Sequence, residues 1–235
     1  MVTARWTKIS LTALCAGLAL ATAVRAAVME YGPVDKALGD RPVALAVTPG
    51  DRVVAAVQDT STPVVGWFDT VDWRPDALQQ AFNSLTEARC IVAAGDASDP
   101  ILLVGGDGVA VLYIDDSTEP ATFGEAPTIG LSGAVVTALA WDAARGVAYG
   151  ADLDGLVHWV PVTGAGGAVN SADGWPVALS FAPRDLALID VDTLLLAGED
   201  VLGTSLAIVR LGGALPEVEY LELVGDEAPV VAVAG

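Results

Sequence analysis

The sequence predicts an all-β protein built from repeated units of three or four short strands. Apolar runs rich in Val, Ile, Leu and aromatic residues fill the chain from residue 42 onward, and Gly, Pro and Asp interrupt them at close intervals. Such an alternation of strand-forming runs and turn residues is typical of short antiparallel strands. Two recurring features, an aspartate and a strand motif, extend this prediction over the whole chain.

The recurring aspartate appears at a nearly constant spacing. Asp59, Asp107, Asp154 and Asp200 are separated by 48, 47 and 46 residues, and each follows one apolar run and precedes another. We therefore expect each aspartate in the turn between the middle and the third strand of its unit. Asp and the neighbouring Gly tolerate the backbone conformations that such turns require.

The strand motif recurs in step with the aspartates. PVALAV begins at residue 42, CIVAAG at 90, VTALAW at 136, PVALSF at 176 and PVVAVA at 229. A period in the forties with several strands per unit is typical of β-propeller blades. The sequence thus predicts a β-propeller of four recognisable blades, at residues 42–89, 90–135, 136–175 and 176–228, plus one extra inner strand at 229–235.

Within each blade, the motif strand is expected at the hub, and the four aspartates are expected on one rim. The outer strand of the first blade is the exception. Leu78, Ala81, Phe82 and Leu85 have the i, i+3, i+4, i+7 spacing of an amphipathic helix, and Pro75 suits a first helical turn. We predict one short helix near residues 75–87, which replaces or covers that strand.

Closure of the ring is open to two interpretations. A propeller closes when one terminus completes the blade that the other began. Residues 28–41, in an N-terminal lead-in at 27–41, can supply at most one outer strand to a fifth blade. Either the protein is a four-bladed body with a spare strand, or the chain is a piece of a longer propeller, and we favour the second interpretation.

The third unit, VTALAWDAARGVAYGADLDGLVHWVPV, resembles a blade of the broad class of WD-repeat, YVTN-type and quinoprotein-like propellers. The resemblance extends loosely over residues 42–235. It implies a structural role for the turn aspartates. The units carry neither the Gly-His pair and closing Trp-Asp of true WD repeats nor the Asp-box of sialidases, so the sequence indicates no single propeller family.

The first 26 residues have the pattern of a secretory signal peptide. Arg5 and Lys8 precede an apolar stretch at residues 9–24, and small residues around Ala26 suit cleavage. An uncleaved membrane anchor is the competing interpretation, but the stretch is shorter than the roughly 20 residues that span a bilayer. We expect export by the general secretory route to an extracytoplasmic location, either periplasm or medium, with no membrane association after cleavage.

The chain is strongly acidic. Its formal net charge is −19, and loss of residues 1–26 would leave 8 basic and 30 acidic residues, a charge of −22. This charge repels nucleic acid and anionic lipid. It favours a protein or cationic partner, although it also serves solubility alone. The oligomeric state is left open.

Candidate chemical groups are few. His158 is the only histidine, and we expect it to form structural hydrogen bonds in a strand. Cys90 would be alone after signal cleavage, so we expect a buried, inert thiol rather than a disulfide. The sequence predicts no catalytic residue, cofactor or firm metal site. Asp152 and Asp154 are weak calcium candidates, since the spacing of their oxygens suits that ion but completes no calcium-binding loop. Trp73 and Trp175 are candidates for a sugar-binding rim.

These observations predict a binding or scaffold module that acts through protein–protein interaction. An extracytoplasmic propeller enzyme with a site in the central channel, of the quinoprotein or lactonase kind, is the main alternative. The inner strands are nearly pure Ala, Val and Leu, which argues against that alternative. A fragment of a large surface protein is the third possibility.

Overall fold

The computed structural model describes residues 42–48, 53–58, 63–68, 75–81, 85–96, 98–115, 122–131, 133–162, 168–200 and 203–221. Every regular element in these ranges is a β-strand. The signal peptide predicted at residues 1–26, the lead-in at 27–41 and the extra strand at 229–235 lie outside them.

The strands form four antiparallel sheets of four strands each, and each sheet follows chain order. The first sheet contains β1 (Pro42–Val47), β2 (Val53–Gln58), β3 (Pro63–Phe68) and β4 (Pro75–Ala81). The second contains β5 (Ala88–Gly95), β6 (Pro100–Gly106), β7 (Val109–Asp115) and β8 (Thr122–Glu125). The third contains β9 (Val136–Asp142), β10 (Val147–Asp152), β11 (Leu156–Pro161) and β12 (Val177–Ala178). The fourth contains β13 (Ala182–Asp190), β14 (Thr193–Asp200), β15 (Gly203–Arg210) and β16 (Glu217–Leu221).

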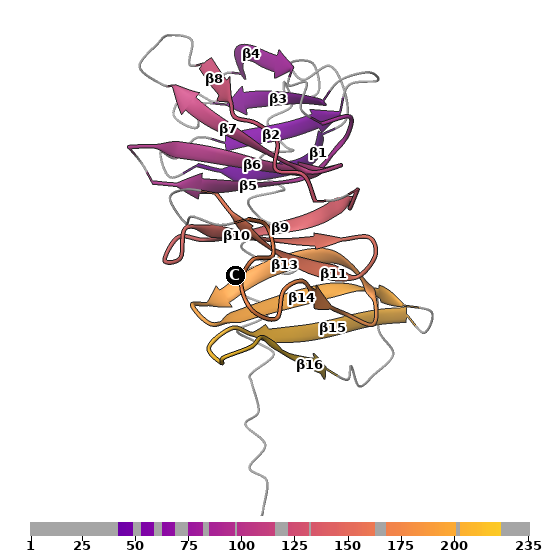
Figure 1. The fold of residues 1–235 in the computed structure, drawn as a ribbon. Helices are drawn as coiled ribbons and strands as arrows, with labels where there is room; N and C mark the ends of the chain where they lie inside the picture. Colours follow the sequence, from indigo (N-terminus) through magenta and orange to yellow (C-terminus); the bar gives the residue numbers. More distant parts are fainter. Residues whose placement is uncertain are drawn as a thin grey trace, which may run out of the picture.

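The sheets follow one another face to face along the molecule, with the first sheet at one end and the fourth at the other (Figure 1). Each first strand packs against the next one, so that β1 contacts β5, β5 contacts β9 and β9 contacts β13. This is the arrangement of consecutive propeller blades, and it confirms the predicted all-β, β-propeller-like fold.

Three apolar cores fill the spaces between consecutive sheets. Strand β6 shows how one strand serves two cores, because successive side chains of a strand point to opposite faces. Leu102 and Val104 join the core with the first sheet, whereas Ile101 and Leu103 join the core with the third. All seven residues of β6 are buried as a result. The third core, between the third and fourth sheets, includes Tyr149.

The predicted helix near residues 75–87 is wrong, because Pro75–Ala81 form strand β4. This strand pairs antiparallel with β3, from Phe68 opposite Pro75 to Val64 opposite Ala81. The helical spacing is a local property of the sequence. The free edge of β3 offers backbone hydrogen-bond partners along its whole length, and residues 75–81 pair with that edge instead of forming a helix. Of the expected helical face, Leu85 is buried in the connection to the second sheet.

The assignment of residues 176–181 as the first strand of the fourth unit is also wrong. Val177 and Ala178 form β12, the outermost strand of the third sheet, and pair with β11. The first strand of the fourth sheet, β13, begins at Ala182. The letters shared with residues 42–47 therefore encode different strands, because the available pairing partner decides which sheet a short apolar run joins.

Candidate functional site

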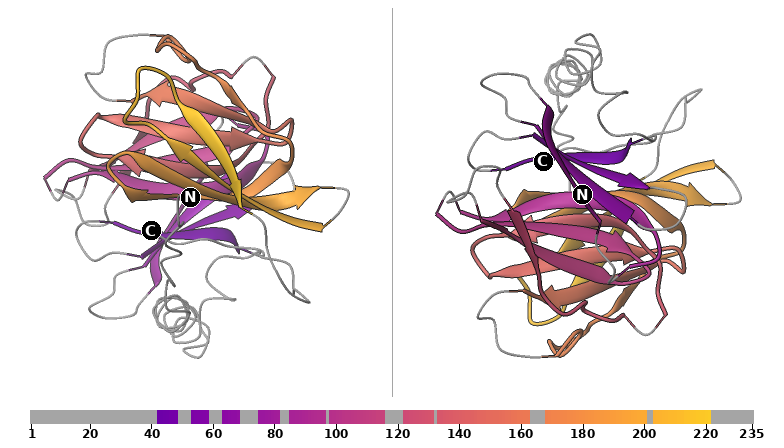
Figure 2. Two further views of the ribbon diagram at one scale, coloured as in Figure 1. Left: turned by 90° about the horizontal axis from the view of Figure 1, so that it is seen from below. Right: turned by 90° about the horizontal axis from the view of Figure 1, so that it is seen from above.

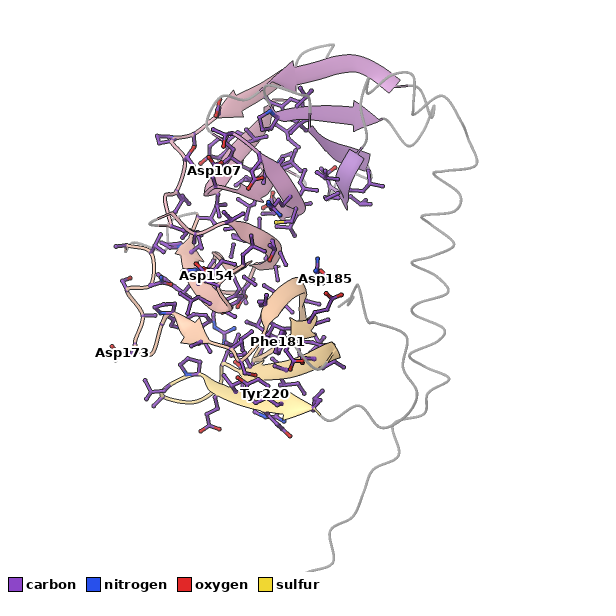
Figure 3. All side chains as sticks on the ribbon, turned by 90° about the vertical axis from the view of Figure 1, so that its right-hand side faces the viewer. Asp107, Asp154, Asp173, Phe181, Asp185 and Tyr220 are labelled. Carbon is purple, nitrogen blue, oxygen red and sulfur yellow. The ribbon has the colours of Figure 1, made fainter. Side chains whose placement is uncertain are left out.

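The predicted turn aspartates occupy equivalent positions in three sheets. Asp107 lies between β6 and β7, Asp154 between β10 and β11, and Asp200 ends β14 before β15. Figure 3 labels Asp107 and Asp154. Asp59 lies outside the described residues.

Asp107 and Asp200 accept hydrogen bonds from within their own sheets and the connections to them. Both the backbone N–H and the Oγ1 hydroxyl of Thr86 donate to the Asp107 carboxylate, at 2.9 and 2.7 Å. Partial burial raises the pKa of Asp107, but these hydrogen bonds outweigh it and hold that pKa below its usual value. The Ser205 hydroxyl donates to Asp200 at 2.9 Å. These two aspartates therefore stabilise turns and connections.

In the third sheet the buried carboxylate belongs to Asp152, not to Asp154. Asp152 is 1% exposed, and its Oδ1 accepts the backbone N–H groups of Asp154 and Leu156 at 2.9 and 2.8 Å. Its Oδ2 lies 2.8 Å from Nε2 of His158. Asp152 thus joins the turn to the third strand.

His158 is held on both sides. The backbone N–H of Trp159 donates to Oδ1 of Asn170 at 2.9 Å, so the Asn170 amide nitrogen faces Nδ1 of His158, at 3.0 Å. Because this nitrogen donates, Nδ1 accepts, and the ring proton lies on Nε2 and points to Asp152. Both ring nitrogens are occupied and the residue is 5% exposed. This network is built for structure, as the sequence predicted for His158, and leaves the imidazole no free nitrogen to activate a nucleophile.

The calcium candidates Asp152 and Asp154 belong to this hydrogen-bonded turn. Both oxygens of Asp152 already accept hydrogen bonds from the protein. Among the described residues, no group of three or more His, Cys, Asp or Glu side chains is placed to hold a metal ion. The calcium hypothesis at Asp152 and Asp154 therefore stays a prediction.

The thiol of Cys90 faces the interior of the second sheet. A side chain at Gly105 would collide with its Sγ and with Val136, so the thiol is enclosed although the residue as a whole is only half-buried. Burial raises the pKa of the thiol to about 12.

A half-open cavity lies between the third and fourth sheets. It has a volume of about 350 Å³. Its walls come from β10, β11, the segment before β12 and the β15–β16 turn, and they include Tyr149, Trp159, Asp173, Trp175 and Leu215. The rings of Tyr149 and Trp175 stack with centroids 5.3 Å apart and planes inclined by 25°. The third sheet thus contributes a stacked pair of aromatic rings to the cavity lining.

Arg145 closes one side of the cavity and links two sheets. From the β9–β10 turn, its guanidinium forms ion pairs with Asp142 at 2.7 Å and with Asp192 of the β13–β14 turn at 2.5 Å. It also donates to the backbone carbonyl of Val191. The hydrogen bond with Asp142 is the main cause of the raised pKa of Arg145. Its charge is therefore compensated within the protein.

Asp173 is the acidic residue of the cavity lining. It is exposed, and it forms no hydrogen bond or ion pair with the described residues. Figure 3 shows it at one side of the molecule, far from Asp185 of the first strand β13. The cavity thus combines aromatic walls, a neutralised arginine and one available carboxylate.

Only part of this cavity was predictable from the sequence. Trp175 was a predicted sugar-binding candidate, whereas its proposed companion Trp73 lies outside the described residues. The sequence did not point to Arg145, Tyr149 and Asp173, because the turn, the strand and the loop that carry them come together only when the third sheet forms. The Asp-Ala-Ala-Arg turn at residues 142–145 was the one local signal, since an aspartate often accepts backbone N–H groups two or three residues onward.

Within the part of the chain that the structure describes, there is no helix with the length and apolarity needed to cross a membrane.

Comparisons of sequence found no relative. No protein family model matches the chain, and neither does any curated protein.

Comparison of structures found propeller-like neighbours. A protein from Lactobacillus plantarum shares 15% identity with a TM-score of 0.52, and the match covers 77% of this chain and 54% of that one. A chain of the mitotic checkpoint complex shares 16% identity with a TM-score of 0.51, over 75% of this chain and 50% of that one. A protein of unknown function from Bacteroides thetaiotaomicron VPI-5482 shares 14% identity with a TM-score of 0.55, over 77% and 43%.

The chain spans about half the length of these neighbours. At such low identity the likeness concerns the fold alone. Together with the four consecutive four-stranded sheets, it supports a β-propeller-like domain without assigning a family.

Proposed function

We propose that the protein is an exported, acidic β-propeller domain that acts as a binding or scaffold module and recognises basic segments of partner proteins. The observation that carries this proposal is the cavity between the third and fourth sheets, whose lining includes Trp159, Trp175 and the available carboxylate of Asp173.

This combination suits a lysine or arginine side chain of a partner. A cation placed over the face of a Trp ring is attracted by the π-electrons, and a nearby carboxylate adds an ion pair. The volume of about 350 Å³ accommodates a long side chain. The formal net charge of −19 attracts basic partners over longer distances and raises the rate of encounter.

The test measures binding of a short arginine- and lysine-rich peptide labelled with fluorescein, by fluorescence anisotropy. We expect Trp175→Ala to weaken binding about tenfold, which corresponds to the 1–2 kcal/mol of a favourable cation–π contact. Asp173→Asn, which removes one exposed charge and leaves the fold intact, should weaken binding about threefold or more.

Asp99→Asn is the matched control, because Asp99 is an exposed acid of the β5–β6 turn, outside the cavity. If the proposed site binds the peptide, the control binds like the unmodified protein at physiological salt. Equal weakening by Asp173→Asn and Asp99→Asn would show binding to overall charge and would contradict the cavity as the site.

Export is part of the proposal and has its own test. Arg5, Lys8 and the apolar stretch at residues 9–24 support cleavage near Ala26. Mass spectrometry of the protein recovered outside the cytoplasm should find a mature chain that begins at Ala27. Arg5→Glu with Lys8→Glu should reduce export, because the positive segment is lost. Recovery of the intact N-terminus in the membrane fraction would favour the anchor instead.

A further inference from the structure

Each of the two end sheets carries apolar side chains on the face that is turned away from the other described sheets. In β1 of the first sheet, Val43, Leu45 and Val47 are 43%, 41% and 55% exposed. Ala44 and Ala46, which alternate with them, pack against the core shared with the second sheet. The exposed side chains therefore lie on the opposite face of this strand. The first sheet stands at one end of the molecule (Figure 2, right).

The same position in an interior sheet is covered. In β9, Ala138 and Ala140 pack toward the fourth sheet, while Val136 and Leu139 pack toward the second. All four are buried. The exposure of the β1 side chains thus results from the absence of a preceding sheet among the described residues, and not from the nature of the strand.

The fourth sheet lies at the other end of the molecule (Figure 2, left). Leu194 and Leu196 are buried toward the third sheet. The alternating Leu195 and its cross-strand partner Ile208 face the other way and are half-buried. The ion pairs Arg184–Glu199 and Arg210–Glu219 flank this apolar centre. An apolar centre with a polar margin is the usual anatomy of a protein interface.

Consecutive sheets of the chain form the same kind of interface three times. The outer faces of the first and fourth sheets correspond to the two sides of that interface. Each sheet packs the same side onto its successor, through β1–β5, β5–β9 and β9–β13. The outer face of the fourth sheet is the side that would receive a successor, and the outer face of the first sheet is the side that would receive a predecessor. Within the described residues, β1 and β13 do not pack on each other as the consecutive first strands do.

We propose that a second copy of this chain covers both faces, with two molecules joined head to tail around a two-fold axis. The first sheet of one molecule then follows the fourth sheet of the other, and the reverse contact closes the ring. Two copies of four sheets give eight, within the range of about four to eight blades seen in propellers. Because the rotation closes, the assembly ends at two copies and does not grow into a filament.

The lengths of the structural neighbours support a second copy of the chain as the partner that covers the two end faces. The match covers 54%, 50% and 43% of the three neighbouring chains, so the four sheets correspond to about half of each. A second copy would contribute four more sheets of the same kind. This proposal does not depend on the peptide-binding function, since the cavity lies inside one molecule.

The test is the mass in solution of the protein purified as its cell produces it, measured by sedimentation equilibrium. We expect twice the mass of the single chain. Leu45→Glu and Ile208→Glu, which place a charge on the two opposite end faces, should each halve the measured mass. Leu153→Glu changes an exposed leucine of the β10–β11 turn and should leave the dimer intact.

The two variants also distinguish the geometry of the dimer. In a head-to-tail ring, each interface contains one face of each kind, so either variant alone disrupts both contacts. If identical faces met instead, only one of the two variants would dissociate the dimer, and the head-to-tail arrangement would be overturned. A single-chain mass for the unmodified protein would overturn the proposal. In that case another part of the same chain would have to cover the end faces. Circular dichroism establishes that each variant is folded.

Discussion

The turn after β10 contains two neighbouring aspartates, Asp152 and Asp154, that have different structural roles. In Asp152-Leu153-Asp154, the repeat spacing selected Asp154, yet Asp152 is the buried residue that accepts three hydrogen bonds. The side chain of Asp154 is exposed to solvent. The sequence period identified the correct turn, and the burial of one side chain decided which aspartate supports it.

We expect Asp152→Ala to lower the free energy of unfolding by about 3 kcal/mol, because it leaves two backbone N–H groups and His158 without their acceptor. Asp154→Ala is the matched control and should cost less than about 0.5 kcal/mol, as is usual for exposed sites. Urea denaturation of the two variants measures the difference. Equal losses would mean that the turn, and not the buried network, supplies the stability.

The hydrogen bonds of His158 predict a single tautomer. Long-range ¹H–¹⁵N NMR should show a protonated Nε2 and an unprotonated, hydrogen-bonded Nδ1. The sequence contains only one histidine, so the assignment is immediate. Asn170→Ala should release Nδ1 and shift its resonance. A protonated Nδ1 in the unmodified protein would contradict the network.

Two buried groups predict a loss of stability in alkali. Burial raises the pKa of Cys90 from 9.0 to about 12 and that of Tyr149 from 10.0 to about 12. Above pH 9 the unfolded chain releases protons that the folded chain retains. The stabilisation is therefore complete below about pH 9 and is lost as the pH rises toward 12. Urea midpoints measured across this range should fall, and Cys90→Ala should make the decline less steep.

At the scale of the element, the outer strands depended most on tertiary context. Residues 75–81 carry a helical spacing and residues 176–181 carry the letters of an inner strand, yet both contribute the fourth strand of a sheet. Their identity comes from the free edges of β3 and β11. The inner strands β1, β5 and β9 were predicted correctly from their runs of Val, Leu and Ala, whereas the inner strand of the fourth sheet, β13, was not.

The turn between β10 and β11 shows how one element constrains the next. Gly155 has a φ of +81°, and a Cβ there would lie 2.9 Å from the carbonyl oxygen of Phe181, in the connection to the fourth sheet. Gly155→Ala should cost about 2 kcal/mol, because it adds backbone strain and separates the two segments. Gly130→Ala, with open space around its Cβ, should be nearly neutral. Thermal unfolding compares them.

At the scale of the whole molecule, the acidic charge predicts attraction of cations without a specific calcium site. The oxygens of Asp152 are occupied by the protein, and neither Asp107 nor Asp200 belongs to a metal-binding group among the described residues. We expect millimolar calcium to leave the unfolding midpoint unchanged relative to an ionic strength matched with sodium chloride. A rise specific to calcium would restore the hypothesis of a metal site.

The sequence by itself determined the repeat, its all-β character and the position of the turn after each second strand. These properties are local, since strand propensity and turn chemistry are encoded within a few residues. Only the tertiary structure decided which segments became outer strands, which aspartate was buried, and how Arg145, Tyr149, Asp173 and Trp175 came to line one cavity. Those outcomes depend on edges and faces supplied by distant parts of the chain, which no local pattern specifies.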